Sequence, residues 1–249
     1  MRLFLTSISF LSRIPVPMGW QVSRDEDFLR LPRWFWLAGL LIGGVNGLIA
    51  AGATPFLPVT MVAAIAACIQ IIITGAFHED GFADVADAMG GYTRERRFEI
   101  MRDPRLGTFG VSALAAVILL RFAGYVHLGG LASWSLPVFL ILIGGWSRWA
   151  SVLVLQILPY AHPQGKGIGK GLRPAGWLVI ASSAAILSGL TWFWNPIWLA
   201  ALVPGLALAV LVSCTLFRRV FGSVNGDCLG ATCIASELFA LIAIVMATG

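Results

Sequence analysis

The sequence predicts an all-α integral membrane protein, a polytopic bundle of about seven transmembrane helices. Its 249 residues are 58% hydrophobic and only 12% charged, whereas soluble domains are about 25% charged. Mean hydropathy is +0.86, and apolar runs of bilayer-crossing length recur along the chain. These runs use most of the residues, so we expect one domain, 1–249, without a separate soluble unit.

The expected elements follow in chain order. The first 17 residues contain a short apolar run that Arg13 interrupts, which favours a helix lying in the membrane interface over a signal peptide. Turns containing proline or glycine then separate alternate pairs of apolar runs. We expect spans at residues 34–54, 59–77, 108–128, 134–158, 175–194, 197–217 and 229–247.

The basic residues indicate the orientation. They lie before the first span and in alternate loops, whereas the three turns on the opposite side contain no Lys or Arg. By the positive-inside rule, the N-terminus and charged loops are cytoplasmic and the C-terminus lies on the far side of the cytoplasmic (inner) membrane. The net charge of +5 therefore reflects orientation in the lipid bilayer, and we expect no nucleic-acid partner.

Seven of the twelve acidic residues lie between positions 78 and 107. Asp80, Asp84 and Asp87 are spaced i, i+4 and i+7, which places them on one face of a helix. Like charges so placed repel one another, and Mg²⁺ compensates such charge through hard oxygen ligands. A solvated acidic helix start is the alternative. Small residues between the aspartates leave room for a substrate, so the pattern favours a metal site.

Other acidic and titratable residues extend this site. Asp103 and Asp227 are candidate ligands, although Asp227 could instead cap the last helix. His78 is either a proton acceptor or metal ligand, or a helix cap or supporting residue, and the sequence leaves this open. Glu79 lies off the face of Asp80 and is not assigned to the site.

Basic residues nearby suit a phosphate-bearing substrate. Arg102 and Arg105 would bind phosphate, although surface ion pairing of this helix is the alternative. Lys166 and Lys170 belong to the glycine-rich loop 164–173, which either grips phosphates or is a mobile linker.

Two arginines fall inside expected spans. Charges at membrane depth are costly and usually face a polar cavity or a partner. For Arg148 this favours a functional role in substrate binding, and for Arg121 function and structural pairing are equally favoured.

These residues together resemble the cobalamin synthase family, the adenosylcobinamide-GDP ribazoletransferases. The family's first motif looks like H-x-D-G-x-A-D-x-x-D, which His78, Asp80, Asp84 and Asp87 match here, whereas the loop at 164–173 matches loosely. The resemblance is carried by residues 10–17, 78–88, 99–110, 147–148 and 226–231.

The resemblance implies the last step of cobalamin (vitamin B12) biosynthesis. Adenosylcobinamide-GDP and α-ribazole, or its 5′-phosphate, would give adenosylcobalamin, or its phosphate, and GMP, with Mg²⁺ as cofactor. The enzyme would be a transferase of substituted phosphate groups that acts by direct displacement. Asp80, Asp84, Asp87 and His78 would be catalytic, and Arg102, Arg105 and Arg148 would neutralise the leaving phosphate.

Two rival functions remain from the sequence. A CDP-alcohol phosphotransferase uses a related D-G-x-x-A-R motif, but Asp84 and Val85 stand where that motif has Ala and Arg. A cation-coupled transporter would place its site near the bilayer midplane in broken helices. The sequence does not decide whether the chain forms a homo-oligomer or associates with other enzymes of the pathway.

Overall fold

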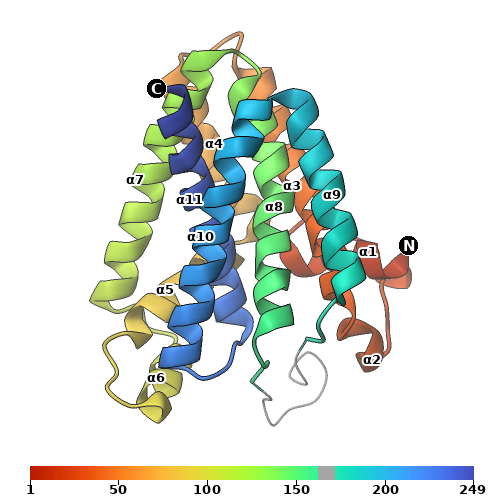
Figure 1. Ribbon diagram of the computed structural model, residues 1–249, viewed down its shortest axis with the longest axis vertical. Helices are drawn as coiled ribbons and strands as arrows, with labels where there is room; N and C mark the ends of the chain where they lie inside the picture. Colours follow the sequence, from red (N-terminus) through yellow and green to blue (C-terminus); the bar gives the residue numbers. More distant parts are fainter. Residues whose placement is uncertain (162–171) are drawn as a thin grey trace.

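The computed structural model describes residues 1–161 and 172–249, and in those stretches it shows a helical bundle without strands (Figure 1). One isolated bridge pairs Tyr160 with Val224. The helices are α1 Arg2–Leu11, α2 Asp25–Phe28, α3 Phe35–Ala53, α4 Val59–Thr74, α5 Phe77–Ala88, α6 Arg94–Met101, α7 Thr108–Leu131, α8 Ser135–Ile157, α9 Trp177–Trp194, α10 Pro196–Val220 and α11 Gly226–Thr248.

Six helices of the described chain are long and apolar enough to cross a membrane: α3, α7, α8, α9, α10 and α11. This confirms the predicted polytopic bundle. The remaining expected span, 59–77, is observed as α4, after which the chain bends by 89° into α5. The 16 residues of α4 extend about 24 Å, less than the roughly 30 Å of bilayer hydrocarbon. The bent pair of α4 and α5 therefore counts as one further crossing, which gives up to seven spanning segments.

Two consecutive residues produce the bend. Gly75 and Ala76 adopt left-handed conformations with φ of 63° and 59°, which end α4 and redirect the chain. The segment after α1 lies against this break. The amide of Arg13 donates to the carbonyl of Ile73 at 2.7 Å, and the Arg13 side chain occupies the space that a Cβ at Gly75 would need. The N-terminal segment therefore supports the start of α5.

The middle of the bundle is formed by α8, most of whose residues are buried. It packs closely on α3 because glycines remove side chains from the contact. A Cβ on Gly144 of α8 would lie 3.1 Å from the Cα of Gly43 of α3. This close packing places Arg148, one turn further along α8, inside the protein with only 2% of its surface exposed.

The connections between the helices lie at the two opposite ends of the bundle (Figure 1). Helices α5 and α6 and the connection from α10 to α11 lie at one end, which we call the charged end. The turns after α3, α7 and α9 lie at the opposite end, together with the C-terminus. The acidic stretch thus follows a broken helix and lies toward the charged end.

Candidate active site

Asp80 and Asp84 lie one turn apart on α5 and face the same cavity. This cavity has a volume of about 290 Å³, and Arg102, Asp103 and Arg105 also line it. The helical spacing in the sequence thus predicted correctly that the two aspartates share a face. Five of the residues selected from the sequence meet in one small polar space.

Asp87 is positioned differently. Its two carboxylate oxygens each accept a hydrogen bond of 2.8 Å, one from the amide of Gly107 and one from the amide of Gly110. These amides belong to the start of α7, where backbone N–H groups otherwise lack partners. Asp87 therefore anchors the N-terminus of α7. It lines a neighbouring cavity of about 290 Å³ that shares Asp103 and Arg105 with the first.

The backbone of Asp227, in α11, packs directly against Gly81 of α5. A Cβ on Gly81 would lie 2.8 Å from the Cα of Asp227, so the backbones of α5 and α11 touch. The alternative role of Asp227 as helix cap is wrong, because Asn225 caps α11 by accepting a hydrogen bond of 2.9 Å from the amide of Cys228. The Asn225 side chain also donates to Asp227 Oδ2 at 2.9 Å, which orients that carboxylate.

The carboxylates share one electrostatic environment. Burial, followed by the charges of Asp227, Asp80 and Asp87, raises the pKa of Asp84 from 3.8 to about 7. Neighbouring carboxylates disfavour one another's ionised forms, and a divalent cation would remove that penalty. In the described residues no three His, Cys, Asp or Glu side chains are already gathered closely enough to hold a metal. The donors are nevertheless hard oxygens, which fit Mg²⁺ once their side chains converge.

Asp103 and Arg105 form an exposed pair at the rim of the cavity. Arg105 Nε and Nη2 donate to the two oxygens of Asp103 at 2.9 and 2.6 Å. This hydrogen bonding lowers the pKa of Asp103 to about 2, so the carboxylate is ionised near neutral pH. Asp103 thus already has a cationic partner, whereas Arg102 makes no ion pair with any carboxylate of the described chain.

His78 and Arg148 meet in a second cavity of about 200 Å³, apart from Asp80 and Asp84. His78 Nδ1 lies 3.5 Å from Arg148 Nη2, and His78 Nε2 and Arg148 Nε are buried without a hydrogen-bond partner in the described chain. Burial, then the charges of Arg148 and Arg121, hold the pKa of His78 well below its usual range. The aromatic walls of this cavity are Phe10, Phe35, Phe77 and Tyr160.

A buried network of ion pairs connects α5, α7 and α11. It was not predicted from the sequence. Arg121 donates to both oxygens of Glu237 at 2.8 Å and to Glu79 at 2.6 Å, and Tyr125 donates to Glu237 at 2.6 Å. Arg121 is therefore paired structurally, which resolves the two roles that the sequence left open. Glu79, set aside from the sequence, is one of its partners. The available signal was Glu237, an acidic residue inside the last apolar run.

Lys166 and Lys170, expected to bind substrate, lie outside the described residues.

Comparisons with known proteins agree on one family. The family model described as cobalamin-5-phosphate synthase matches residues 3–245. Curated relatives named adenosylcobinamide-GDP ribazoletransferase include those of Allorhizobium ampelinum, 37% identical over 97% of this chain and 95% of the relative, and Vibrio cholerae, 35% identical over 93% and 88%. The relative from Desulfitobacterium hafniense is 32% identical over 97% of this chain and 96% of its own. No solved structure matches the chain.

Proposed function

The chain belongs to the cobalamin-5-phosphate synthase family, and from this premise we propose that it is an adenosylcobinamide-GDP ribazoletransferase. The reaction joins adenosylcobinamide-GDP to α-ribazole, or its 5′-phosphate, and releases GMP. The product is adenosylcobalamin or its 5′-phosphate. The observation that carries the proposal is the match to relatives of this name along nearly the whole chain.

Mg²⁺ is the proposed cofactor. Asp80, Asp84 and Asp227 would hold it, because Asp80 and Asp227 are charges that raise the pKa of Asp84 and Asp80 lines the same cavity as Asp84. When bound, Mg²⁺ would neutralise negative charge on the diphosphate. Asp87 and Asp103 are weaker candidates as ligands, since the oxygens of each already accept hydrogen bonds.

The chain's own groups account for the remaining steps. Arg102 and Arg105 line the aspartate cavity and would bind the phosphate that departs with GMP, since guanidinium groups pair well with phosphate oxygens. Phosphoryl transfer depends mainly on positioning and neutralisation of charge. No Ser, Cys, Lys or His occurs among the described residues that line this cavity, which supports direct displacement.

The proton of the attacking hydroxyl needs an acceptor near that phosphate. The sequence proposes a carboxylate or His78, and the geometry favours a carboxylate of the Asp80–Asp84 cavity, because His78 lines the other one. His78 and Arg148 would instead bind a distant part of a substrate. Their buried unpartnered nitrogens, within aromatic walls, suit a flat group that bears hydrogen-bond acceptors.

We place the enzyme in the cytoplasmic (inner) membrane with the charged end toward the cytoplasm. The apolar spanning helices and the distribution of Lys and Arg support this, because basic loops remain on the cytoplasmic side. The CDP-alcohol phosphotransferase and transporter alternatives are not favoured, since the family match covers both the aspartate helix and most spans.

The test is an assay of the purified protein with adenosylcobinamide-GDP, α-ribazole and Mg²⁺. We expect one GMP for each cobalamin formed, and no product when either substrate is left out. Release of CMP from a CDP-alcohol, or solute uptake by reconstituted vesicles without cobalamin formation, would contradict the proposal.

A further inference from the structure

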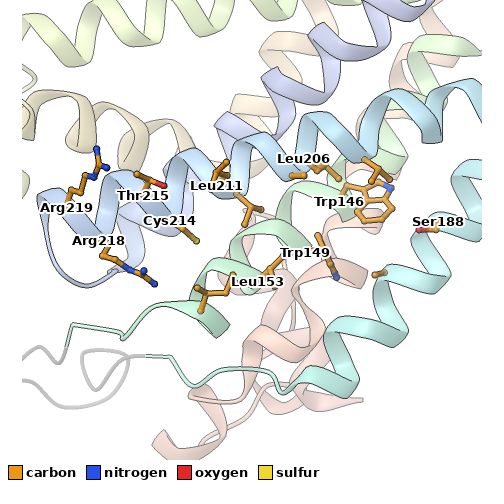
Figure 2. Close-up of a pocket in the computed structure, with 15 residues that line it drawn as sticks. Trp146, Trp149, Leu153, Ser188, Leu206, Leu211, Cys214, Thr215, Arg218 and Arg219 are labelled. Carbon is orange, nitrogen blue, oxygen red and sulfur yellow. The ribbon is translucent and has the colours of Figure 1, made fainter.

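A large cavity lies away from the aspartates, between α8, α9 and α10 (Figure 2). Its volume is about 860 Å³. Trp146, Trp149 and Leu153 contribute one face of α8, and Leu206 and Leu211 contribute the facing side of α10. We call this space the α8–α10 groove.

Most of the residues that line the α8–α10 groove are apolar. The indole N–H of Trp146 already donates to Thr191 at 3.0 Å, and that of Trp149 donates to the carbonyl of Ile180 at 3.0 Å. The groove opens sideways, because Leu211 and Val203 are 63% and 46% exposed. For helices that span a membrane, the exposed apolar side faces lipid.

One end of the groove is basic. Arg218 and Arg219 line it and occupy the last turn of α10, at the charged end of the bundle (Figure 1). Neither makes an ion pair with a carboxylate in the part of the chain that the structure describes. Figure 2 shows both arginines at the far end of the groove from Trp146.

We propose that the α8–α10 groove binds one anionic phospholipid, with its acyl chains against Trp146, Trp149 and Leu206 and its phosphate on Arg218 and Arg219. An apolar groove that ends in two guanidinium groups is complementary to an apolar tail with an anionic head. Basic pockets between transmembrane helices bind anionic head groups in this way, and guanidinium binds phosphate through paired hydrogen bonds. The proposal does not depend on the reaction that the enzyme performs.

The experiment compares the purified wild-type protein with the double variant Arg218→Gln/Arg219→Gln. The matched control is Arg30→Gln/Arg33→Gln, which removes the same charge from exposed positions outside the groove. Native mass spectrometry counts retained phospholipids, and thermal unfolding is followed during titration with phosphatidylglycerol or phosphatidylcholine. A third variant, Ala207→Trp, fills the groove at an exposed position of α10 and leaves both arginines in place.

We expect the wild type and the control to retain phosphatidylglycerol and to be stabilised by it but not by phosphatidylcholine. The double variant should lose about tenfold or more in affinity, because charge-assisted hydrogen bonds are removed, and Ala207→Trp should also retain less. Equal retention by all four proteins, or an equal response to phosphatidylcholine, would overturn the proposal. Displacement of the lipid by adenosylcobinamide-GDP would also overturn it, because the groove would then be a substrate site.

Discussion

Gly81 of α5 and Asp227 of α11 touch through their backbones. A Cβ at Gly81 would lie 2.8 Å from the Cα and 2.9 Å from the carbonyl oxygen of Asp227. This contact holds Asp227 near Asp84, whose pKa it helps to raise to about 7. The glycine therefore sets how closely carboxylates from two helices approach each other.

The Gly81→Ala substitution tests that contact. Backbone atoms cannot move aside as a flexible side chain can, so we expect a loss of about 1–3 kcal/mol in the free energy of unfolding. Activity should fall as well, because Asp227 is displaced. The matched control is Gly44→Ala, a glycine in the helix α3 with no atom within 4 Å of the added Cβ. Thermal unfolding and GMP release measure both effects, and equal behaviour of the two variants would contradict this role of Gly81.

Asp84 should make the metal-free protein less stable as pH rises. Its pKa in the folded protein is about 7, compared with an ordinary value of 3.8, so between these values the folded state keeps a proton that the unfolded chain has released. The free energy of unfolding therefore falls as pH rises through this window and stays low above it. Mg²⁺ should restore stability above the window, because the ionised carboxylate is the form that binds metal.

Thermal unfolding across that pH range, with and without Mg²⁺, measures this trend. Asp84→Asn should flatten it, since an amide does not titrate. An unchanged pH dependence in Asp84→Asn would show that another group is responsible.

Replacing Arg121 should lower the stability of the fold more than it changes the aspartate site. Its side chain is 1% exposed and pairs with Glu79 and Glu237, and Arg121→Met would leave both carboxylates buried without a cation. Such a loss typically costs about 3–5 kcal/mol. Combining it with Glu79→Gln and Glu237→Gln should recover much of the thermal stability. Failure of this rescue would mean that charge burial is not the cause of the damage.

The Asp87→Ala substitution tests whether Asp87 anchors the N-terminus of α7 or binds the metal. The variant loses two charge-assisted hydrogen bonds to the amides of Gly107 and Gly110, for which we expect a loss of about 2–3 kcal/mol in the free energy of unfolding. Affinity for Mn²⁺, measured in place of Mg²⁺, should change little. The control is Glu95→Ala, an exposed acid on α6. Lost metal affinity with unchanged stability would support the ligand role that the sequence predicted for Asp87.

Hydropathy and charge were enough to predict most of the bundle. The first span was expected at residues 34–54 and is observed as Phe35–Ala53, because an apolar run between polar turns leaves few other ways to satisfy its backbone in lipid. Helical spacing was enough to place Asp80 and Asp84 in one cavity. Both predictions depend on local patterns, an apolar run and a helical spacing, which a sequence displays directly.

Features that depend on long-range contacts were not predictable in this way. The bend at Gly75 and Ala76 joins an apolar helix to the acidic helix α5, and hydropathy carries no information about the φ angles that produce it. The hydrogen-bond partners of Asp87, the amides of Gly107 and Gly110, are 20 and 23 residues away in the sequence. Likewise, Glu237 and Arg121 are 116 residues apart, so only the folded structure pairs them.

The central claim is that carboxylates of α5 and α11 hold the metal used for phosphoryl transfer. Electron paramagnetic resonance of Mn²⁺ added to the wild type and to Asp84→Asn tests it most directly, with GMP release measured on the same samples in Mg²⁺. We predict a bound Mn²⁺ signal in the wild type, and its loss in Asp84→Asn together with a fall in activity of about 100-fold or more while the protein stays folded. Equal Mn²⁺ binding and equal GMP release by the two proteins would contradict the claim.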